Sequence, residues 1–264
     1  MKKMWAVLAV ATAMVIPGMV RADTLQSAMQ GVLQYTSGAN AGDFIYFYDF
    51  FMTASDKLTA KAPPATTCGA SGTATCWYEG ITLYDFLGYV DHGVQSPAAG
   101  DWTMSDSGSE HIPVGLVIVE NPFIQDLSWS YTGAGNILGS SVPSLSAFYG
   151  CDSNVDIIVT NGDGTTGTFN GESVIAPFGL LPNGGNPACF WAESPGLPVG
   201  VVQASGQNTK DAAFANNTRV RGGYEEVGPA SPVPEPTSLL LLGTGLLGLG
   251  SRLRKKSKKD TPSV

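Results

Sequence analysis

The sequence has few of the residues and motifs on which catalysis most often depends. It contains two histidines, His92 and His111, and it has no G-x-S-x-G turn, no H-E-x-x-H helix and no phosphate-binding loop. Both histidines are interpreted as surface or turn residues. The scarcity of groups for proton transfer favours a protein that is not an enzyme.

Carboxylates keep one catalytic alternative open, because a glycosidase needs two suitably separated acids and no histidine. Acidic side chains lie on both sides of Trp102, at Asp101, Asp106, Glu110 and Glu120. Spacing along a chain does not give the distance between such acids in space. A glycan-active hydrolase therefore remains the alternative to a protein without catalytic activity.

The first 22 residues are typical of a secretory signal peptide. Lys2 and Lys3 precede an apolar stretch over residues 4–16. Compact residues then lead to Ala22, which predicts cleavage between Ala22 and Asp23. The secretion translocon and signal peptidase are therefore expected partners, and an uncleaved N-terminal anchor is the alternative.

The C-terminal end combines an apolar run with a cluster of cations. Residues 237–251 carry no ionisable side chain, and as a helix they would span about 22 Å, which is short of the ~30 Å apolar core of a bilayer. Cations behind such a run hold the C-terminus on the cytoplasmic side. The basic residues here are Arg252, Arg254, Lys255, Lys256, Lys258 and Lys259. The pattern predicts a transmembrane helix over 237–251 whose contact with membrane lipid is transient.

A short proline motif stands directly before that helix, at Val233, Pro234, Glu235 and Pro236. Residues 233–259 as a whole resemble the PEP-CTERM protein-sorting signal, a tail that is also labelled an ice-binding protein C-terminal domain. The resemblance implies an exosortase-type membrane protease that processes the chain near the Pro-Glu-Pro motif. It further implies a Gram-negative host that makes extracellular polysaccharide. An ordinary single-span anchor is the alternative.

Basic residues are scarce between the two ends. Nine of the 14 Lys and Arg residues lie in the first 22 and last 13 positions, which leaves five bases against 21 acids and a formal charge of −16 for residues 23–236. The five are spread along the sequence, at Lys57, Lys61, Lys210, Arg219 and Arg221. Phosphate binding needs a basic patch, and none is predicted, so nucleic acid is not an expected partner. The acidity suits a soluble protein or one that binds divalent cations.

The exported part contains four cysteines, Cys68, Cys76, Cys151 and Cys189. An even number in an oxidising compartment predicts two disulfides with three possible connectivities. The pairs favoured here are the local ones, Cys68 with Cys76 and Cys151 with Cys189. A zinc site is not predicted, because the sequence has no C-x-x-C and no histidine near these cysteines.

One string has the spacing of a calcium loop. Asp152, Asn154 and Asp156 match its start, but Ile157 occupies the sixth position, where the loop requires glycine. No metal and no other cofactor are therefore predicted, although a calcium site built from separate loops stays open.

Residues 23–212 are predicted to form a β-rich exported domain. An amphipathic helix is expected over residues 24–35, where apolar side chains fall at helical spacing (Leu25, Met29, Val32, Leu33). Short β-branched and aromatic segments follow between Gly, Asn and Pro clusters, at 44–52, 81–89, 112–119, 126–131, 155–160, 167–175, 189–192 and 199–204. This spacing favours an antiparallel β-sandwich. The hydrophobic pattern then ends, and residues 213–232 are expected to be a flexible linker.

Tryptophan supplies a candidate ligand contact, since aromatic faces can stack on sugar rings. Trp102 lies in a polar stretch between Asp101 and Thr103 and is the predicted contact with a glycan. The sequence as a whole indicates an exported protein of the cell surface or the exopolysaccharide and biofilm matrix, with a structural or adhesive role. A secreted carbohydrate-binding protein and a membrane-anchored envelope protein are the alternatives.

Overall fold

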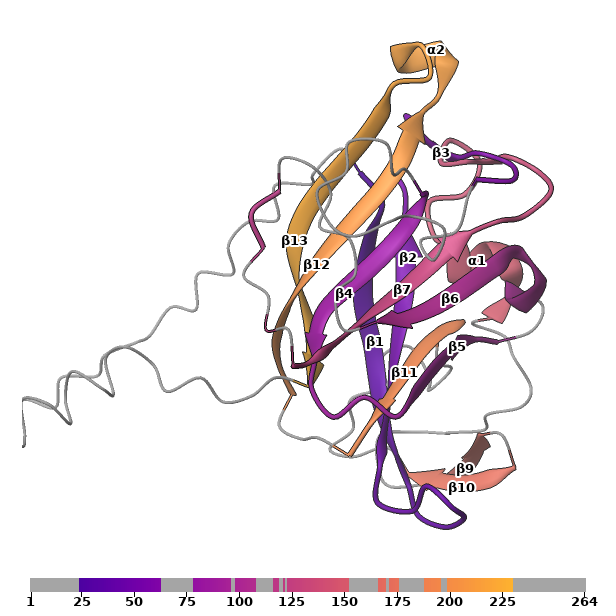
Figure 1. Cartoon of the computed structure of the whole chain (residues 1–264). Coiled ribbons are helices and arrows are strands. Elements are labelled where there is room, and N and C mark those ends of the chain that lie inside the picture. The colour runs from indigo at the N-terminus through magenta and orange to yellow at the C-terminus, as the bar shows by residue number, and fades with distance from the viewer. Residues whose placement is uncertain are drawn as a thin grey trace, which may run out of the picture. The chain divides into compact units, whose positions relative to one another are not determined.

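A computed structural model of the chain describes residues 24–62, 78–95, 98–107, 116–118, 121, 123–151, 166–169, 171–175, 188–195 and 199–229 (Figure 1). The predicted signal peptide, the Cys68–Cys76 loop and the predicted sorting signal over 233–259 lie outside these residues. Among the described residues, no helix is long and apolar enough to cross a membrane. The predicted membrane helix over 237–251 is not among them.

The described chain contains a sheet of six antiparallel strands in the order β5-β11-β2-β1-β10-β9. These strands are β1 (Gln26–Tyr35), β2 (Phe44–Phe51), β5 (Asp91–Val94), β9 (Thr166–Phe169), β10 (Glu172–Ile175) and β11 (Phe190–Ser194). The segment predicted as one strand over 167–175 is thus the hairpin of β9 and β10. The strands predicted over 44–52 and 189–192 are confirmed as β2 and β11.

A second antiparallel sheet of the described chain has the order β6-β7-β4-β12-β3-β8, and β13 pairs with β12. Its strands are β3 (Asp56–Leu58), β4 (Gly80–Phe86), β6 (Trp102–Ser107), β7 (Gln125–Tyr131), β8 (Ile137–Leu138), β12 (Val199–Lys210) and β13 (Arg219–Pro229). Short helices lie between strands: η2 (Ala98–Asp101), α1 (Leu145–Tyr149) and α2 (Ala212–Ala215). The strands predicted over 81–89, 126–131 and 199–204 are confirmed as β4, β7 and β12. Those over 112–119 and 155–160 fall largely or wholly outside the described residues.

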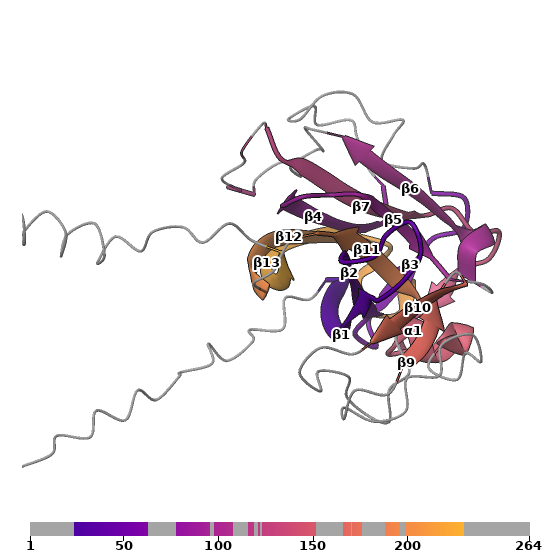
Figure 2. The same ribbon diagram turned by 90° about the horizontal axis from the view of Figure 1, so that it is seen from below.

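Side chains from both sheets form one apolar core, and Figure 2 shows β4, β6 and β7 in one layer with β1 and β2 in the other. Phe50 of β2 stacks on Phe190 of β11 with ring centroids 3.8 Å apart. The same Phe50 ring meets the edge of Trp129 of β7 at 5.8 Å, which joins the two sheets. Aromatic pairs of this geometry contribute beyond the area they bury. The prediction of a mainly β, antiparallel fold is confirmed.

Strand β2 is buried on both of its faces, which explains its unbroken apolar sequence. Tyr46, Tyr48 and Phe50 face the core between the sheets, whereas Ile45 and Phe47 belong to a second apolar cluster. Phe169 of β9 joins this second cluster, with its ring 5.5 Å from that of Phe47. The β9–β10 hairpin therefore supplies apolar cover for the outer face of β2.

The helix predicted over residues 24–35 is wrong, because this segment forms β1. The register of β1 against β2 shifts between Met29 and Gly31, so a bulge interrupts the two-residue alternation. Beyond the bulge, adjacent Val32 and Leu33 point into different apolar clusters. Because β1 has a bulge and contributes to apolar clusters on both of its faces, its apolar residues do not alternate and instead fall at the spacing of a helix.

The linker predicted over residues 213–232 is also wrong for most of its length. It contains α2 and β13, and β13 pairs with β12 along a continuous register from Thr209–Arg219 to Val199–Pro229. The exposed positions of β13 include Arg219, Arg221 and Glu225. Charged residues on an edge strand prevent pairing with other chains. They also interrupt the alternation of apolar and polar residues that predicts a strand from sequence.

A disulfide joins Cys151, which follows α1, to Cys189, which precedes β11. This confirms one of the two predicted pairs, and the Cys68–Cys76 pair stays a prediction. Helix α1 is also held through its N-terminal residues, because Asp49 of β2 accepts hydrogen bonds from the Ser144 hydroxyl at 2.5 Å and from the Ser146 backbone at 2.9 Å. The disulfide and Asp49 therefore fasten α1 to the first sheet.

Replacing both Cys151 and Cys189 by serine is expected to lower the free energy of unfolding by about 2–4 kcal/mol. The disulfide closes a loop with a sequence separation of 38 residues, so its loss increases the conformational entropy of the unfolded chain. Urea unfolding at neutral pH measures the loss. The Cys68→Ser, Cys76→Ser double variant is the matched control and loses less, since its loop is much shorter. An unchanged urea midpoint in the first variant would contradict the expectation.

Candidate functional site

Trp102, the predicted glycan contact, is part of the core and is 4% exposed. Its ring lies edge-to-face with Phe190 at 4.9 Å and with Tyr131 at 5.4 Å. The prediction is therefore wrong: Trp102 opens β6 and faces inward, while its polar neighbours in sequence point elsewhere. Of the acids around it, Asp101 accepts a hydrogen bond from Tyr149 at 3.1 Å, and Glu110 and Glu120 lie outside the described residues.

His92 is buried, which corrects its interpretation as a surface or turn residue. The imidazole lies edge-on to Trp129 at 5.1 Å, its Nε2 atom is 3.3 Å from the carbonyl oxygen of Ser128, and its Nδ1 atom is 3.1 Å from the Tyr89 hydroxyl. Burial lowers the pKa of His92 below its usual value. A neutral imidazole held by these contacts is a packing residue of β5.

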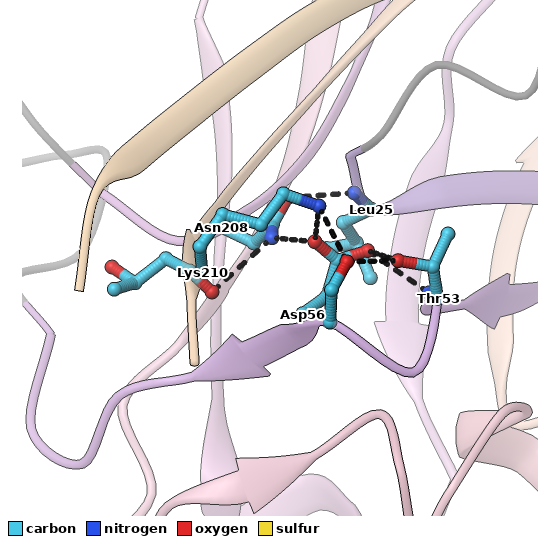
Figure 3. A network of polar contacts seen from close by, with 7 residues as sticks. Leu25, Thr53, Asp56, Asn208 and Lys210 are labelled. Atoms are coloured by element: carbon cyan, nitrogen blue, oxygen red, sulfur yellow. Dashed lines mark hydrogen bonds and ion pairs between the residues drawn. The ribbon is translucent and has the colours of Figure 1, made fainter. Parts of the chain in front are cut away.

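A buried ion pair between Asp56 and Lys210 lies at the junction of β3 and β12 (Figure 3). The ammonium group of Lys210 and a carboxylate oxygen of Asp56 are 2.5 Å apart, and the two side chains are 3% and 0% exposed. Asp56 also accepts hydrogen bonds from the Asn208 amide at 2.7 Å and from the Thr53 hydroxyl at 2.7 Å. Asn208 in turn accepts from the backbone of Leu25 at 2.8 Å, so the network reaches the start of β1.

The opposite face of β3 and β12, together with the neighbouring strand β13, carries cations that are less buried than Lys210. Lys57 of β3 pairs in register with Thr209 of β12, and Thr209 pairs with Arg219 of β13. Directly paired residues point to the same face of a sheet, whereas successive residues alternate. Lys57, Thr209 and Arg219 therefore form a row on one face, and Asp56 and Lys210 lie on the other.

This row borders a pocket of about 360 Å³. The basic pocket, as it is called from here on, is lined by Lys57, Thr59, Ala60, Lys61, Ala62, Glu79, Thr209, Asn217 and Arg219. Three of the five bases of residues 23–236 line this pocket, although Arg219 is far in sequence from Lys57 and Lys61. The expectation that these bases make no patch is therefore wrong, because strand pairing brings together what sequence spacing separates.

The acidic member of the basic pocket, Glu79, is engaged by protein donors. Its carboxylate accepts a hydrogen bond from the Thr209 hydroxyl at 2.5 Å and another from the backbone N–H of Thr59. Glu79 is buried, whereas Lys61, Asn217 and Arg219 are exposed. The carboxylate therefore lies beneath the pocket and the cations lie around its opening.

Two residues of the basic pocket have left-handed backbones. Lys61 has φ 56° and Asn217 has φ 59°. Asparagine tolerates this conformation, but for lysine it costs about 1 kcal/mol or more. Hydrogen bonds fix the Lys61 turn, since its backbone N–H donates to Gly133 at 2.8 Å and the N–H of Ala62 donates to Thr59 at 3.3 Å. Strained residues of this kind gather at binding sites.

A cluster of acids surrounds Glu193 of β11, which is 1% exposed. Burial, followed by the charges of Asp43 and Asp91, raises the pKa of Glu193 to about 7. Asn40 donates a hydrogen bond to the same carboxylate at 3.3 Å. In the part of the chain that the structure describes, no group of three or more His, Cys, Asp or Glu side chains is placed to hold a metal ion.

Replacing Lys210 by methionine is expected to lower the free energy of unfolding by about 3–5 kcal/mol, because it leaves the buried Asp56 carboxylate without its counter-ion. The Asp56→Asn, Lys210→Met double variant recovers part of this loss. Lys57→Met is the control, because Lys57 is next to Asp56 in sequence but lies on the opposite face of the sheet. It is expected to change the free energy of unfolding by less than about 1 kcal/mol. Urea unfolding compares the three, and similar losses in both lysine variants would argue against the buried pair.

Glu193 is expected to make stability fall as the pH rises from 5 to 8. Its carboxyl has an ordinary pKa of 4.5 and a folded-state pKa of about 7, so the folded protein holds the proton more tightly between these values. The stabilisation is complete below pH 4.5 and is lost as the pH rises through 7. Melting temperatures at pH 5 and 8 test this, and Glu193→Gln, which stays neutral, should show a smaller decline. An identical decline in both proteins would contradict the assignment.

Comparison with known proteins finds a match for the C-terminal tail but none for the exported domain. No curated protein and no solved structure matches the chain. A family model described as PEP-CTERM protein-sorting motif matches residues 232–255. The match takes in the Pro-Glu-Pro motif, the apolar run over 237–251 and the first basic residues after it. The chain therefore carries a PEP-CTERM protein-sorting motif, which marks it as an exported bacterial protein that an exosortase, itself a membrane protein, sorts and processes.

Proposed function

We propose that this protein is delivered to the cell surface or the extracellular matrix of a Gram-negative bacterium, where it has a structural or adhesive role in exopolysaccharide or biofilm and no catalytic activity. The sorting motif at residues 232–255 is the observation that carries the proposal. The disulfide and the largely aromatic core support it, because both suit a domain that must persist outside the cell. The formal charge of −16 over residues 23–236 supports solubility there.

The tail supplies a physical reason for temporary membrane insertion. The uncharged run over 237–251 is short for a bilayer, and the basic residues after it resist crossing. Cleavage near Pro234 to Pro236 removes both features together and frees the domain. An ordinary single-span anchor keeps them, so the mature C-terminus distinguishes the two.

A carbohydrate-binding role is the second candidate, and the basic pocket favours it. The burial of Trp102 removes the stacking contact expected from sequence, but the pocket offers cations beside neutral polar groups. Binding and a structural role in a polysaccharide matrix are compatible. A hydrolase would instead turn over glycan, and a positive hydrolysis screen with the purified protein would overturn the non-catalytic proposal.

Mass spectrometry of the surface-exposed protein is expected to find a C-terminus near Pro234 to Pro236 and no peptide that contains Lys259. Replacing Pro234 and Pro236 by alanine blocks recognition of the motif, so this variant keeps its tail and stays in the membrane fraction. Ser231→Ala, which lies just outside the matched residues, is the control and is processed normally. An intact Lys259 on the surface-exposed protein would contradict processing.

A further inference from the structure

We propose that the basic pocket binds a carboxylated sugar, with Lys57, Lys61 and Arg219 holding the carboxylate and the neutral polar lining holding the ring hydroxyls. The pocket is lined by residues of β3, β12 and β13 and of the segments next to them. The inference deepens the proposed function, since it names the chemical class of matrix component that the exported domain would meet.

Charge is the first argument. Three cations and one carboxylate line the basic pocket, whereas residues 23–236 as a whole carry 21 acids and five bases. Neighbouring like charges repel and reduce stability. An anion bound among these cations offsets that repulsion.

The row across the sheet is the second argument. Lys57 and Arg219 lie two strands apart with Thr209 between them, and neighbouring strands are about 4.8 Å apart, so the backbones at the two cations are separated by about 10 Å. Long basic side chains from both sides can reach one carboxylate above Thr209. Lys57 donates a hydrogen bond to Asn217, which leaves two of its three ammonium protons for a ligand.

Two charged groups in and beside the basic pocket have partners within the protein. Lys210, the next residue after Thr209, is paired with Asp56 on the opposite face and makes no net contribution. Glu79 accepts hydrogen bonds from Thr209 and from the backbone of Thr59. Counted over its lining residues, the basic pocket has three bases and one acid, a formal charge of +2.

The rest of the lining favours a small polyhydroxylated ligand over a bare anion. Thr59 supplies a hydroxyl group, the Thr209 hydroxyl can accept a hydrogen bond while it donates to Glu79, and Asn217 supplies its amide N–H groups. Ala60 and Ala62 leave room for a ring. The volume of about 360 Å³ is at the lower end of the range for small-molecule sites, about 300–1,000 Å³. Such a site suits one or two sugar units with a single carboxylate.

Isothermal titration calorimetry of the purified exported protein tests the proposal with three probes: glucuronate, glucose and inorganic phosphate. Glucuronate is expected to bind, and glucose at least tenfold more weakly, because it lacks the carboxylate. Raising the salt concentration weakens glucuronate binding through screening. No glucuronate binding, or equal binding of glucose, would overturn the proposal. Phosphate binding as tight as that of glucuronate would show a general anion site and would also overturn it.

Three variants locate the site. Lys57→Gln and Arg219→Gln are each expected to weaken glucuronate binding about tenfold. Lys61→Asn removes a charge but suits the left-handed backbone at this position, so it should weaken binding without loss of thermal stability. Arg221→Gln, two residues from Arg219 on β13 but outside the pocket lining, is the matched control and changes the affinity less than twofold.

If Arg221→Gln and Arg219→Gln weaken glucuronate binding equally, the affinity depends on the overall surface charge and not on the pocket. That result would overturn the assignment of the site. Melting temperatures of all four variants verify that they fold. The outcome is separable from the proposed function: a protein that is processed near Pro234 to Pro236 but does not bind glucuronate retains its sorting and matrix role and loses only the ligand assigned here.

Discussion

The buried pair of Asp56 and Lys210 is the interaction on which this end of the second sheet depends. Removing two charges from water costs several kcal/mol per ion, and the pair is tolerable only when the remaining donors and acceptors are satisfied. Thr53, Asn208 and Lys210 all donate to Asp56. Because Asn208 also accepts from the backbone of Leu25, one polar network fixes the positions of β3 and β12 and the residue before β1.

That network also determines what the other face of the strands presents. Once Asp56 and Lys210 point inward, the two-residue alternation obliges Lys57 and Thr209 to point the opposite way. Continuous pairing of β12 with β13 then places Arg219 beside Thr209. The basic pocket is therefore a consequence of sheet register, and a shift by one residue would bury its cations and expose the ion pair.

Sequence patterns predict the features that depend on residues close together in the sequence. The largely apolar run of β2 and the alternation of apolar and polar residues in β7 each predict a strand, and all parts of the sorting motif lie within about 25 residues. The sequence of β1 predicts a helix because a bulge and burial on both faces disturb its two-residue alternation. The sequence of β13 predicts no strand because its exposed positions carry charged residues. The basic pocket could not be predicted, since Lys57 and Arg219 are joined only by long-range pairing.

The acidity of the exported domain bears on the size of the ligand that the basic pocket can accept. A long polyanion would extend beyond the three cations onto a surface whose formal charge is strongly negative, and repulsion there would offset the attraction within the pocket. A single carboxylated unit, or the end of a chain, avoids that repulsion. The proposed cleavage near Pro234 to Pro236 strengthens this discrimination, because it takes six cations away from the exported protein. The charge distribution thus favours recognition of an isolated or terminal acidic sugar over coating by an acidic polymer.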